Sequence, residues 1–259
     1  MITVFTPTYN RNELLPTIYE CLEKQTFKDF EWVIVDDGSD LSPTLPFREG
    51  ASFPIRLFSQ VNQGKHVAIN HGVREAKGEL FLMLDSDDEL PADALQNIWE
   101  VYETIQENKG FRGVCGMMAH RNGEIISNSQ FTIHNSQFLD TDEISLRYKY
   151  GFNGDLCEVF RTEVLREFPF PEIPGEKFCP EVLVWYRIAR KYKLRVFDKV
   201  IYYRDYLEGG LTSKITRIRK ESPKATDMTY SEMMHLDIPF KFRLRAFINL
   251  WRFRILSRL

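Results

Sequence analysis

The chain has 259 residues and a formal net charge of −3, and 43% of its residues are hydrophobic. A chain of this length and composition can bury a large core as one domain with a small appendage, and it is not a disordered polypeptide. Its slight acidity argues against a general nucleic-acid-binding protein, which needs a basic surface.

The four cysteines are scattered singly along the chain, at Cys21, Cys115, Cys157 and Cys179. None belongs to a C-x-x-C pair, so the spacing indicates reduced thiols rather than a disulfide framework or a zinc site. The first residues do not resemble a signal peptide, and no apolar run approaches the roughly 18 residues that a membrane span needs. We therefore expect a cytoplasmic protein, with a reservation about its C-terminus.

Strand and helix signals alternate through the first half of the chain. Strands are predicted at Ile2–Thr6, Glu31–Val35, Ile55–Ser59 and Leu80–Leu84, and helices at Asn12–Gln25, at Lys65–Ala76 and after Pro91. Asn12 is the expected cap of the first helix, and Gly78 closes the second. The continuous apolar run Leu80–Leu84 is typical of a parallel strand that is buried on both faces.

This alternation predicts an α/β fold with a parallel, Rossmann-like sheet that has helices on both sides. In such sheets ligands bind outside the carboxyl ends of the strands. Three polar segments, Pro7–Arg11, Asp36–Ser39 and Asp85–Asp88, each come directly after a predicted strand. We therefore expect the three segments to meet at one edge of the sheet.

The second half is less regular. Strands are predicted at Gly113–Met118, Glu124–Ser127, Leu194–Phe197 and Val200–Tyr203, and a helix at Glu181–Tyr192. The segment Thr132–Tyr150 is ambiguous between helix and strand.

The sharpest chemical signal is Asp85–Ser86–Asp87, which follows the buried apolar run. Two carboxylates two residues apart can converge on one divalent ion and on the phosphates that it bridges, and such hard oxygen ligands suit Mg²⁺ or Mn²⁺. An acidic loop that caps the helix after Pro91 is the alternative.

Six short motifs occur in a defined order. They are T-P-T-Y-N-R (Thr6–Arg11), V-D-D-G-S (Val35–Ser39), N-Q-G-K (Asn62–Lys65), N-H-G (Asn70–Gly72), A-K-G (Ala76–Gly78) and L-D-S-D-D (Leu84–Asp88). As a set they resemble the family 2 glycosyltransferases, which have the GT-A fold, densely over about residues 1–120 and more thinly to about 215. The resemblance implies a mostly parallel central sheet flanked by helices.

The same resemblance implies a binding site for a nucleotide-sugar donor. Its expected residues are Thr6, Tyr9, Arg11, Asp36, Asp37, Gly64, Lys65 and Asp85. Asp36 or Asp37 can accept hydrogen bonds from uracil and ribose, Tyr9 can lie against the base, and Arg11 can face phosphate. Alternatively Asp36–Ser39 is an ordinary turn and Lys65 is solvated.

The resemblance also assigns the metal and the catalytic base. Asp87 would bind Mn²⁺ or Mg²⁺ directly and Asp85 would contact ribose or metal-bound water, while Asp88 is structural and caps the next helix. Glu181 matches the family's base position, although Pro180 stands where the pattern has its first acid. An acid at a helix start is otherwise explained by the helix dipole alone. The family inverts the anomeric centre in one displacement, so no enzyme nucleophile is expected.

On the acceptor side the resemblance points to Asp155 and Glu158, which can equally be surface acids. The loop Leu207–Ser213 resembles a segment that closes on the diphosphate in relatives, and a plain linker is the alternative.

The C-terminal segment Phe240–Leu259 contains six basic residues and no acid. At helical spacing its apolar stripe consists of Phe240, Leu244, Phe247, Ile248, Trp251 and Ile255. Flanked by basic residues, this stripe is typical of a helix that lies on an anionic membrane. Packing on the catalytic domain and a dimer contact are the alternatives.

We expect a GT-A catalytic domain at 1–215, with a nucleotide-sugar half at about 1–120 and an acceptor half at about 121–215, followed by an amphipathic helical extension at 216–259. The predicted activity is inverting, metal-dependent transfer of a sugar, most simply from UDP, to a glycan or lipid-linked acceptor in cell-surface polysaccharide synthesis. A sugar nucleotidyltransferase would need a glycine-rich first loop, and a phosphohydrolase would not have Glu89 after its acidic motif. A non-catalytic carbohydrate- or nucleotide-binding protein on the same fold stays open.

Overall fold

A computed structural model describes residues 1–126, 137–205 and 214–256. Its strands are β1 (Ile2–Thr8), β2 (Phe30–Asp36), β3 (Ile55–Ser59), β4 (Leu80–Met83), β5 (Phe111–Ala119), β6 (Phe138–Thr141), β7 (Leu156–Arg161) and β8 (Lys193–Tyr203). Its helices are the 3₁₀ turn η1 (Asn12–Leu14), α1 (Leu15–Glu23), α2 (Lys65–Glu75), α3 (Ala94–Glu103), α4 (Glu143–Tyr148), α5 (Thr162–Glu167), α6 (Glu181–Ala189), α7 (Ile215–Glu221), α8 (Pro223–Met234) and α9 (Phe240–Leu256).

The strands form one sheet in the order β3-β2-β1-β4-β7-β5-β8-β6. The first four in that order are parallel, as is the pair β5 and β8, whereas β7 and β6 run antiparallel to their neighbours. The mostly parallel α/β sheet expected from the sequence is confirmed. The antiparallel strand β7, which joins the two parallel parts, was not expected.

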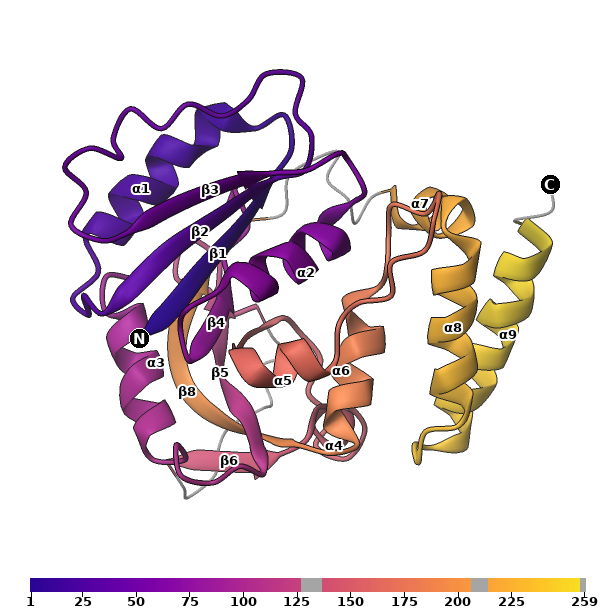
Figure 1. Ribbon diagram of the computed structural model, residues 1–259. Coiled ribbons are helices and arrows are strands. Elements are labelled where there is room, and N and C mark those ends of the chain that lie inside the picture. The colour runs from indigo at the N-terminus through magenta and orange to yellow at the C-terminus, as the bar shows by residue number, and fades with distance from the viewer. Residues whose placement is uncertain (127–136, 206–213, 257–259) are drawn as a thin grey trace.

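Helices cover both faces of the sheet (Figure 1). One apolar cluster joins the sheet to α1 and α3, and a second joins its other face to α2, α5 and α6. In β1, Val4 faces the first cluster and Phe5 the second, and both are fully buried. This double burial explains why the strands of the first half are continuous apolar runs.

Several predicted boundaries are wrong for local reasons. Asn12 does not cap a long helix, because its side-chain amide donates to the Leu41 carbonyl at 2.7 Å; η1 forms there, and α1 begins at Leu15 with Pro16 in its first turn. The helix after Pro91 begins only at Ala94, and α6 ends at Ala189 rather than Tyr192.

The second half departs further from the prediction. The two strands expected over Leu194–Tyr203 are one strand, β8, whose register against β5 is irregular. The expected strand Glu124–Ser127 is reduced to an isolated bridge between Ala119 and Ile125 in its described part. The ambiguous segment holds β6 and α4, and the predicted lid or linker Leu207–Ser213 lies outside the described residues.

The C-terminal helices α8 and α9 pair on one flank of the molecule, with α9 outermost (Figure 1). Tyr230 of α8 packs against Ala246, Leu250 and Phe253 of α9. Among the described residues, no helix is both long and apolar enough to cross a membrane.

Candidate active site

The loops that follow β1, β2 and β4 meet at one edge of the sheet, as expected for adjacent parallel strands. The backbone N–H of Asn10 donates to Ser39 Oγ at 2.7 Å, which joins the first loop to the second. Arg11 Nη1 lies 2.8 Å from Asp87 Oδ2, which joins the first loop to the third. The carboxyl edge therefore gathers the three polar segments into one candidate site.

A lysine at the start of α2 links two acids from distant parts of the chain. Lys65 Nζ lies 2.8 Å from Asp85 Oδ1 and 3.1 Å from Glu181 Oε1. We call this arrangement the Lys65 bridge. Burial would lower the pKa of the lysine, but the two carboxylates outweigh it and raise that pKa. The bridge therefore carries a fixed positive charge between the predicted donor acid and the predicted base.

Both carboxylates of the D-x-D segment have a cation beside them. Burial alone would raise the pKa of Asp85, but Lys65 opposes it and holds that pKa below its usual value. Arg11 pairs with Asp87, and both side chains are partly exposed. Both carboxylates are partly exposed, so a metal ion could replace the cation beside each of them, and the same cations could then contact a phosphate.

The adjacent Asp88 has a different environment. It accepts a hydrogen bond of 2.8 Å from the Tyr202 hydroxyl, which itself accepts one from the Asp85 N–H at 3.0 Å. Burial, reinforced by the Asp85 charge, raises the pKa of Asp88 to about 7. The prediction that Asp88 caps the next helix is wrong, because the N-cap of α3 is Asp93 and the Asp88 carboxylate binds the Tyr202 hydroxyl instead. Sequence reasoning missed Tyr202.

The two acids at the end of β2 differ in their partners. Asp37 accepts hydrogen bonds from Gln60 Nε2, Gln63 N and Gly64 N at 2.8–2.9 Å, so it shapes the segment that leads to Lys65. Asp36 Oδ1 accepts from the N–H and hydroxyl of Ser39. Of the two, Asp36 makes fewer contacts to the chain and has more capacity to accept from a ligand.

Gly64 occupies a position that admits no side chain. Its φ is +97°, and a Cβ there would lie 2.0 Å from the Lys177 carbonyl oxygen. The segment before Lys65 is thus pressed against the segment that precedes Glu181. This contact explains the glycine by packing, alongside the donor contact that the family resemblance implies.

The two remaining predicted donor residues, Tyr9 and Thr6, differ in their exposure. Tyr9 is 48% exposed, so its ring is free to receive a planar ligand. Thr6 is fully buried, and its hydroxyl accepts a hydrogen bond from Trp32 Nε1 at 2.9 Å. Its side chain therefore faces the core and can act on the site only through the loop that it anchors.

The two predicted acceptor-side acids also differ. Asp155 is partly exposed and pairs with Arg204 at 2.9 Å, near the end of β8. Glu158 is mostly buried in β7, with Arg112 Nη2 3.9 Å away. Burial, with Glu143 as the next contribution, raises the pKa of Glu158 to about 8.

Sequence reasoning missed an arginine that contacts the backbone of the D-x-D segment. Arg121 donates to the Asp87 carbonyl oxygen at 3.0 Å and also pairs with Glu89 and Asp205. It lies in a turn after β5 and shows no motif. Only the adjacency of β5 and β8 brings its partners together, so no local signal could have revealed it.

Glu181 is the first residue of α6, as predicted. Helix α8 contacts the chain before Glu181 and also near the end of α6. Glu176, five positions earlier, accepts hydrogen bonds from Lys224 N and Ala225 N at the start of α8, at 2.8 and 2.9 Å. At the other end of α6, Arg187 and Arg190 pair with Glu232 of α8 at 2.6 and 3.2 Å. The helix that carries the predicted base is therefore held by α8.

A divalent ion fits the chemistry of the D-x-D segment. Within the described ranges, no three His, Cys, Asp or Glu side chains form a metal-binding cluster. Mg²⁺ does not require one, because it is usually held by one or two carboxylates together with waters and substrate phosphates. Asp85 and Asp87 supply two such carboxylates at the edge where a donor diphosphate would lie.

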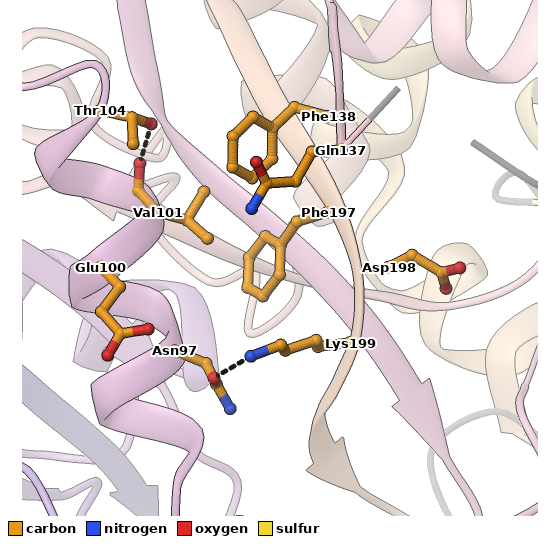
Figure 2. A pocket seen from close by; sticks show the side chains of 9 residues that line it. All are labelled: Asn97, Glu100, Val101, Thr104, Gln137, Phe138, Phe197, Asp198 and Lys199. Atoms are coloured by element: carbon orange, nitrogen blue, oxygen red, sulfur yellow. Dashed lines mark hydrogen bonds between the residues drawn. The ribbon is translucent and has the colours of Figure 1, made fainter. Parts of the chain in front are cut away.

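A pocket of about 370 Å³ lies elsewhere, between α3, β6 and β8. Figure 2 shows Phe138 and Phe197 on one side of it and the Lys199 ammonium bonded to Asn97 on another. Its lining comes from α3 and the residue after it, from the start of β6 and from the middle of β8, and none of these residues belongs to a motif. The pocket is therefore separate from the candidate site.

Comparisons with known proteins identify the family of the chain. The family model "Glycosyl transferase family 2" matches residues 3–168. The chain is 26% identical over 219 residues to the GalNAc(5)-diNAcBac-PP-undecaprenol beta-1,3-glucosyltransferase of Campylobacter jejuni. This alignment covers 82% of this chain and 67% of that protein. It is 31% identical to the amylovoran biosynthesis glycosyltransferase AmsB of Erwinia amylovora, over 40% of this chain and 36% of that protein. The chain thus matches much less than two thirds of the length of some curated relatives.

Solved structures share the fold. Staphylococcus aureus TarS 1-349 in complex with UDP-GlcNAc has a TM-score of 0.67 at 21% identity, over 97% of this chain and 71% of that one. Mannosyltransferase PcManGT from Pyrobaculum calidifontis, in complex with GDP-Man and Mn²⁺, has a TM-score of 0.61 at 20% identity, over 99% and 73%. The GT-A fold and the family resemblance seen in the motifs are confirmed, as is the prediction of a glycosyltransferase. The chain belongs to glycosyl transferase family 2.

Proposed function

We propose that this enzyme transfers a sugar from a UDP-linked donor to a hydroxyl of a glycan or glycolipid in cell-surface polysaccharide synthesis, with inversion at the anomeric carbon. The Lys65 bridge carries this proposal. It joins an acid of the donor side to an acid of the base side through one lysine, at 2.8 and 3.1 Å. Leaving group and attacking hydroxyl would therefore meet between Asp85 and Glu181.

The donor site is assigned from side chains that gather at the carboxyl edge. Tyr9 would lie against the base, and Asp36 would accept from the base or the ribose. Arg11 and Lys65 would face the diphosphate. The choice of UDP follows the UDP-GlcNAc complex of TarS, whose fold this chain shares.

Asp85 and Asp87 would hold Mg²⁺ or Mn²⁺, as the Mn²⁺ complex of PcManGT suggests. A bound divalent ion would neutralise charge on the departing diphosphate. Arg11 and Lys65, which lie beside these two carboxylates, would also neutralise charge on the phosphates.

Glu181 is the proposed base. When the diphosphate draws Lys65 away, the Glu181 carboxylate becomes free to accept the proton of the acceptor hydroxyl. The acceptor oxygen then forms its bond to the anomeric carbon while the bond from that carbon to the diphosphate breaks, and the electron pair leaves with the nucleoside diphosphate. One displacement of this kind inverts the centre.

The acceptor is proposed to be lipid-linked, with Asp155 near its sugar and the reaction on the cytoplasmic face of a membrane. The Campylobacter relative is named for an undecaprenol-linked acceptor. All four cysteines here are free and buried, which suits a reducing compartment.

The test is a calorimetric titration of UDP with and without Mn²⁺. Metal-dependent binding that is retained in Asp198→Ala, a control that removes an exposed carboxylate far from the site, and lost in Asp87→Ala would support the proposal. If UDP, GDP and dTDP all fail to bind the native protein, the proposal is overturned in favour of a non-catalytic protein on this fold.

A further inference from the structure

Exposed apolar side chains are concentrated on one helix. The described residues contain eleven exposed large hydrophobic side chains, and six of them belong to α9. These are Phe240, Leu244, Phe247, Ile248, Trp251 and Ile255, with exposures from 44% to 71%. They are the stripe expected from the sequence, and we call them the α9 stripe.

Packing within the chain does not explain this stripe. The contact of α9 with α8 is made by Ala246, Leu250 and Phe253, which are at most 6% exposed. The helix is thus apolar on two sides, and α8 covers only one of them. A contiguous exposed apolar surface rimmed by polar residues marks an interaction site.

The charges around the stripe are of one sign. Between Phe240 and Leu256 there are five basic residues and no acid. Of these, Arg254 pairs with Asp227, whereas Lys241, Arg243, Arg245 and Arg252 form no ion pair with the described residues. The partner that fits this helix is therefore both apolar and anionic.

The neighbouring helix α7 extends the basic rim. A hollow of about 470 Å³ between α7 and the end of α9 is lined by Lys214, Thr216, Arg217, Lys220 and Leu256. Its lining combines lysine and arginine side chains with the apolar Leu256, which suits a phosphate headgroup attached to acyl chains.

We infer that the α9 stripe and the basic rim of α7 dock the enzyme on the surface of an anionic phospholipid bilayer, with α9 lying in the interface. An amphipathic helix of this kind inserts its apolar side chains at the headgroup boundary while its lysines and arginines contact anionic lipids. Trp251, at 49% exposure, is suited to that boundary. A second copy of the chain is a poorer occupant, because pairing two α9 helices would bring the basic side chains of one against those of the other.

The docked surface lies near the active site. The junction of α7 and α8 binds Glu176 through Lys224 N and Ala225 N, and the next residue, Lys177, contacts the Gly64 position. The end of α9 near α7 is therefore the end nearest the donor segment. Resting on the proposed function, this placement would present a lipid-linked acceptor to the carboxyl edge.

Vesicle co-sedimentation of the full chain tests the inference, with phosphatidylcholine vesicles compared with vesicles that also contain phosphatidylglycerol. We expect binding to the anionic vesicles that weakens with salt, and a loss of at least about tenfold in Phe247→Gln/Trp251→Gln. The matched control Leu41→Gln/Val61→Gln removes two apolar side chains that are each 78% exposed outside α9, and should bind like the native protein.

Two further measurements separate the outcomes. Trp251 emission should shift to the blue on anionic vesicles, and the shift should be absent in Trp251→Phe. Failure of the native protein to bind either vesicle, or equal binding by the α9 variant, overturns the docking surface, as does a dimer that only the α9 variant disrupts. UDP calorimetry on the same samples reports on the proposed function independently, because α9 contributes no donor residue.

Discussion

The donor side and the base side of the active site are built in different ways. On the donor side, Arg11, Asp36 and Asp85 lie within a few residues of the ends of parallel strands that are adjacent in the sheet. On the base side, Glu181 begins a helix that reaches the site because Trp185 packs on Phe160 of β7, with ring centroids 4.4 Å apart. The first arrangement is local in sequence, and the second depends on tertiary contacts.

This difference has a functional consequence. The proposed donor residues are fixed by the strands that precede them, so we expect changes there to act first on nucleotide binding. The proposed base, Glu181, is fixed by contacts of α6 with the sheet and with α8, so we expect changes there to act on the rate of transfer while nucleotide binding survives. The Lys65 bridge is the point where the two sides meet.

The largest effect is expected from Glu181→Gln. Loss of the base should lower kcat by about 10²–10⁴ while the Kd for UDP changes little, because the amide keeps the shape and Lys65 retains Asp85 as a partner. Release of UDP from a panel of UDP-sugars with and without acceptor measures the rate, and Glu49→Gln, an exposed site, is the control. A kcat within a few-fold of native would remove Glu181 from the mechanism.

The next effect tests the close contact between the two sides. Gly64→Ala forces a left-handed residue to carry a Cβ 2.0 Å from the Lys177 carbonyl oxygen. Gly50→Ala is the matched control, because Gly50 has φ +108° and no atom within 4 Å of the added Cβ. We expect Gly64→Ala to be less stable than the control by at least about 2 kcal/mol in urea unfolding, with weakened UDP binding. Equal stabilities would mean that the contact relaxes freely.

The first half of the fold could be predicted from the sequence because each of its signals is local. A continuous apolar run such as Leu80–Leu84 marks a strand buried on both faces, and a polar turn directly after it marks the carboxyl edge. The gathering of these loops into one site followed from parallel pairing alone. The prediction that Asn12 caps the first helix failed because its side chain binds the Leu41 carbonyl, which lies in a different loop.

The second half could be predicted only in part, because its decisive contacts are distant in sequence. The antiparallel strand β7 carries no turn signal that relates it to β4 and β5, its partners across the sheet. Arg121 and Tyr202 contact the D-x-D segment through the ends of β5 and β8. Their roles depend on the order of strands, which periodicity does not encode.

A smaller effect tests whether α8 positions the base. Glu232→Gln breaks the pairs with Arg187 and Arg190 at 2.6 and 3.2 Å, and we expect kcat to fall by about threefold to tenfold with an unchanged KM for the donor. Asp227→Asn is the control on the same helix, because Asp227 pairs with Arg254 of α9 instead. Glu232→Asp should recover part of the rate. Equal losses in Glu232→Gln and Asp227→Asn would indicate a general destabilisation of α8 and no positioning role.

The smallest effect concerns the pH dependence of stability, and it comes from a buried arginine that lies close to two acids. Arg112 Nη2 lies 3.3 Å from Glu143 and 3.9 Å from Glu158, and burial, followed by the charge of Glu143, raises the pKa of Glu158 from 4.5 to about 8. The native state therefore holds a proton on Glu158 that the unfolded chain releases at lower pH. Stability from this group is fully present below about pH 4.5 and declines as the pH rises to about 8.

Glu158→Gln removes that titration while it keeps a neutral side chain of the same size. We expect the free energy of unfolding to fall less steeply between about pH 5 and about pH 8 than in the native protein, by more than about 1 kcal/mol over the interval. Urea unfolding at several pH values measures the slope, and Glu163→Gln, at a 64% exposed carboxylate, should keep the native slope. An unchanged slope in Glu158→Gln would mean that Glu158 is charged in the folded state, and Arg112 would then be shared between two carboxylates inside the base side of the site.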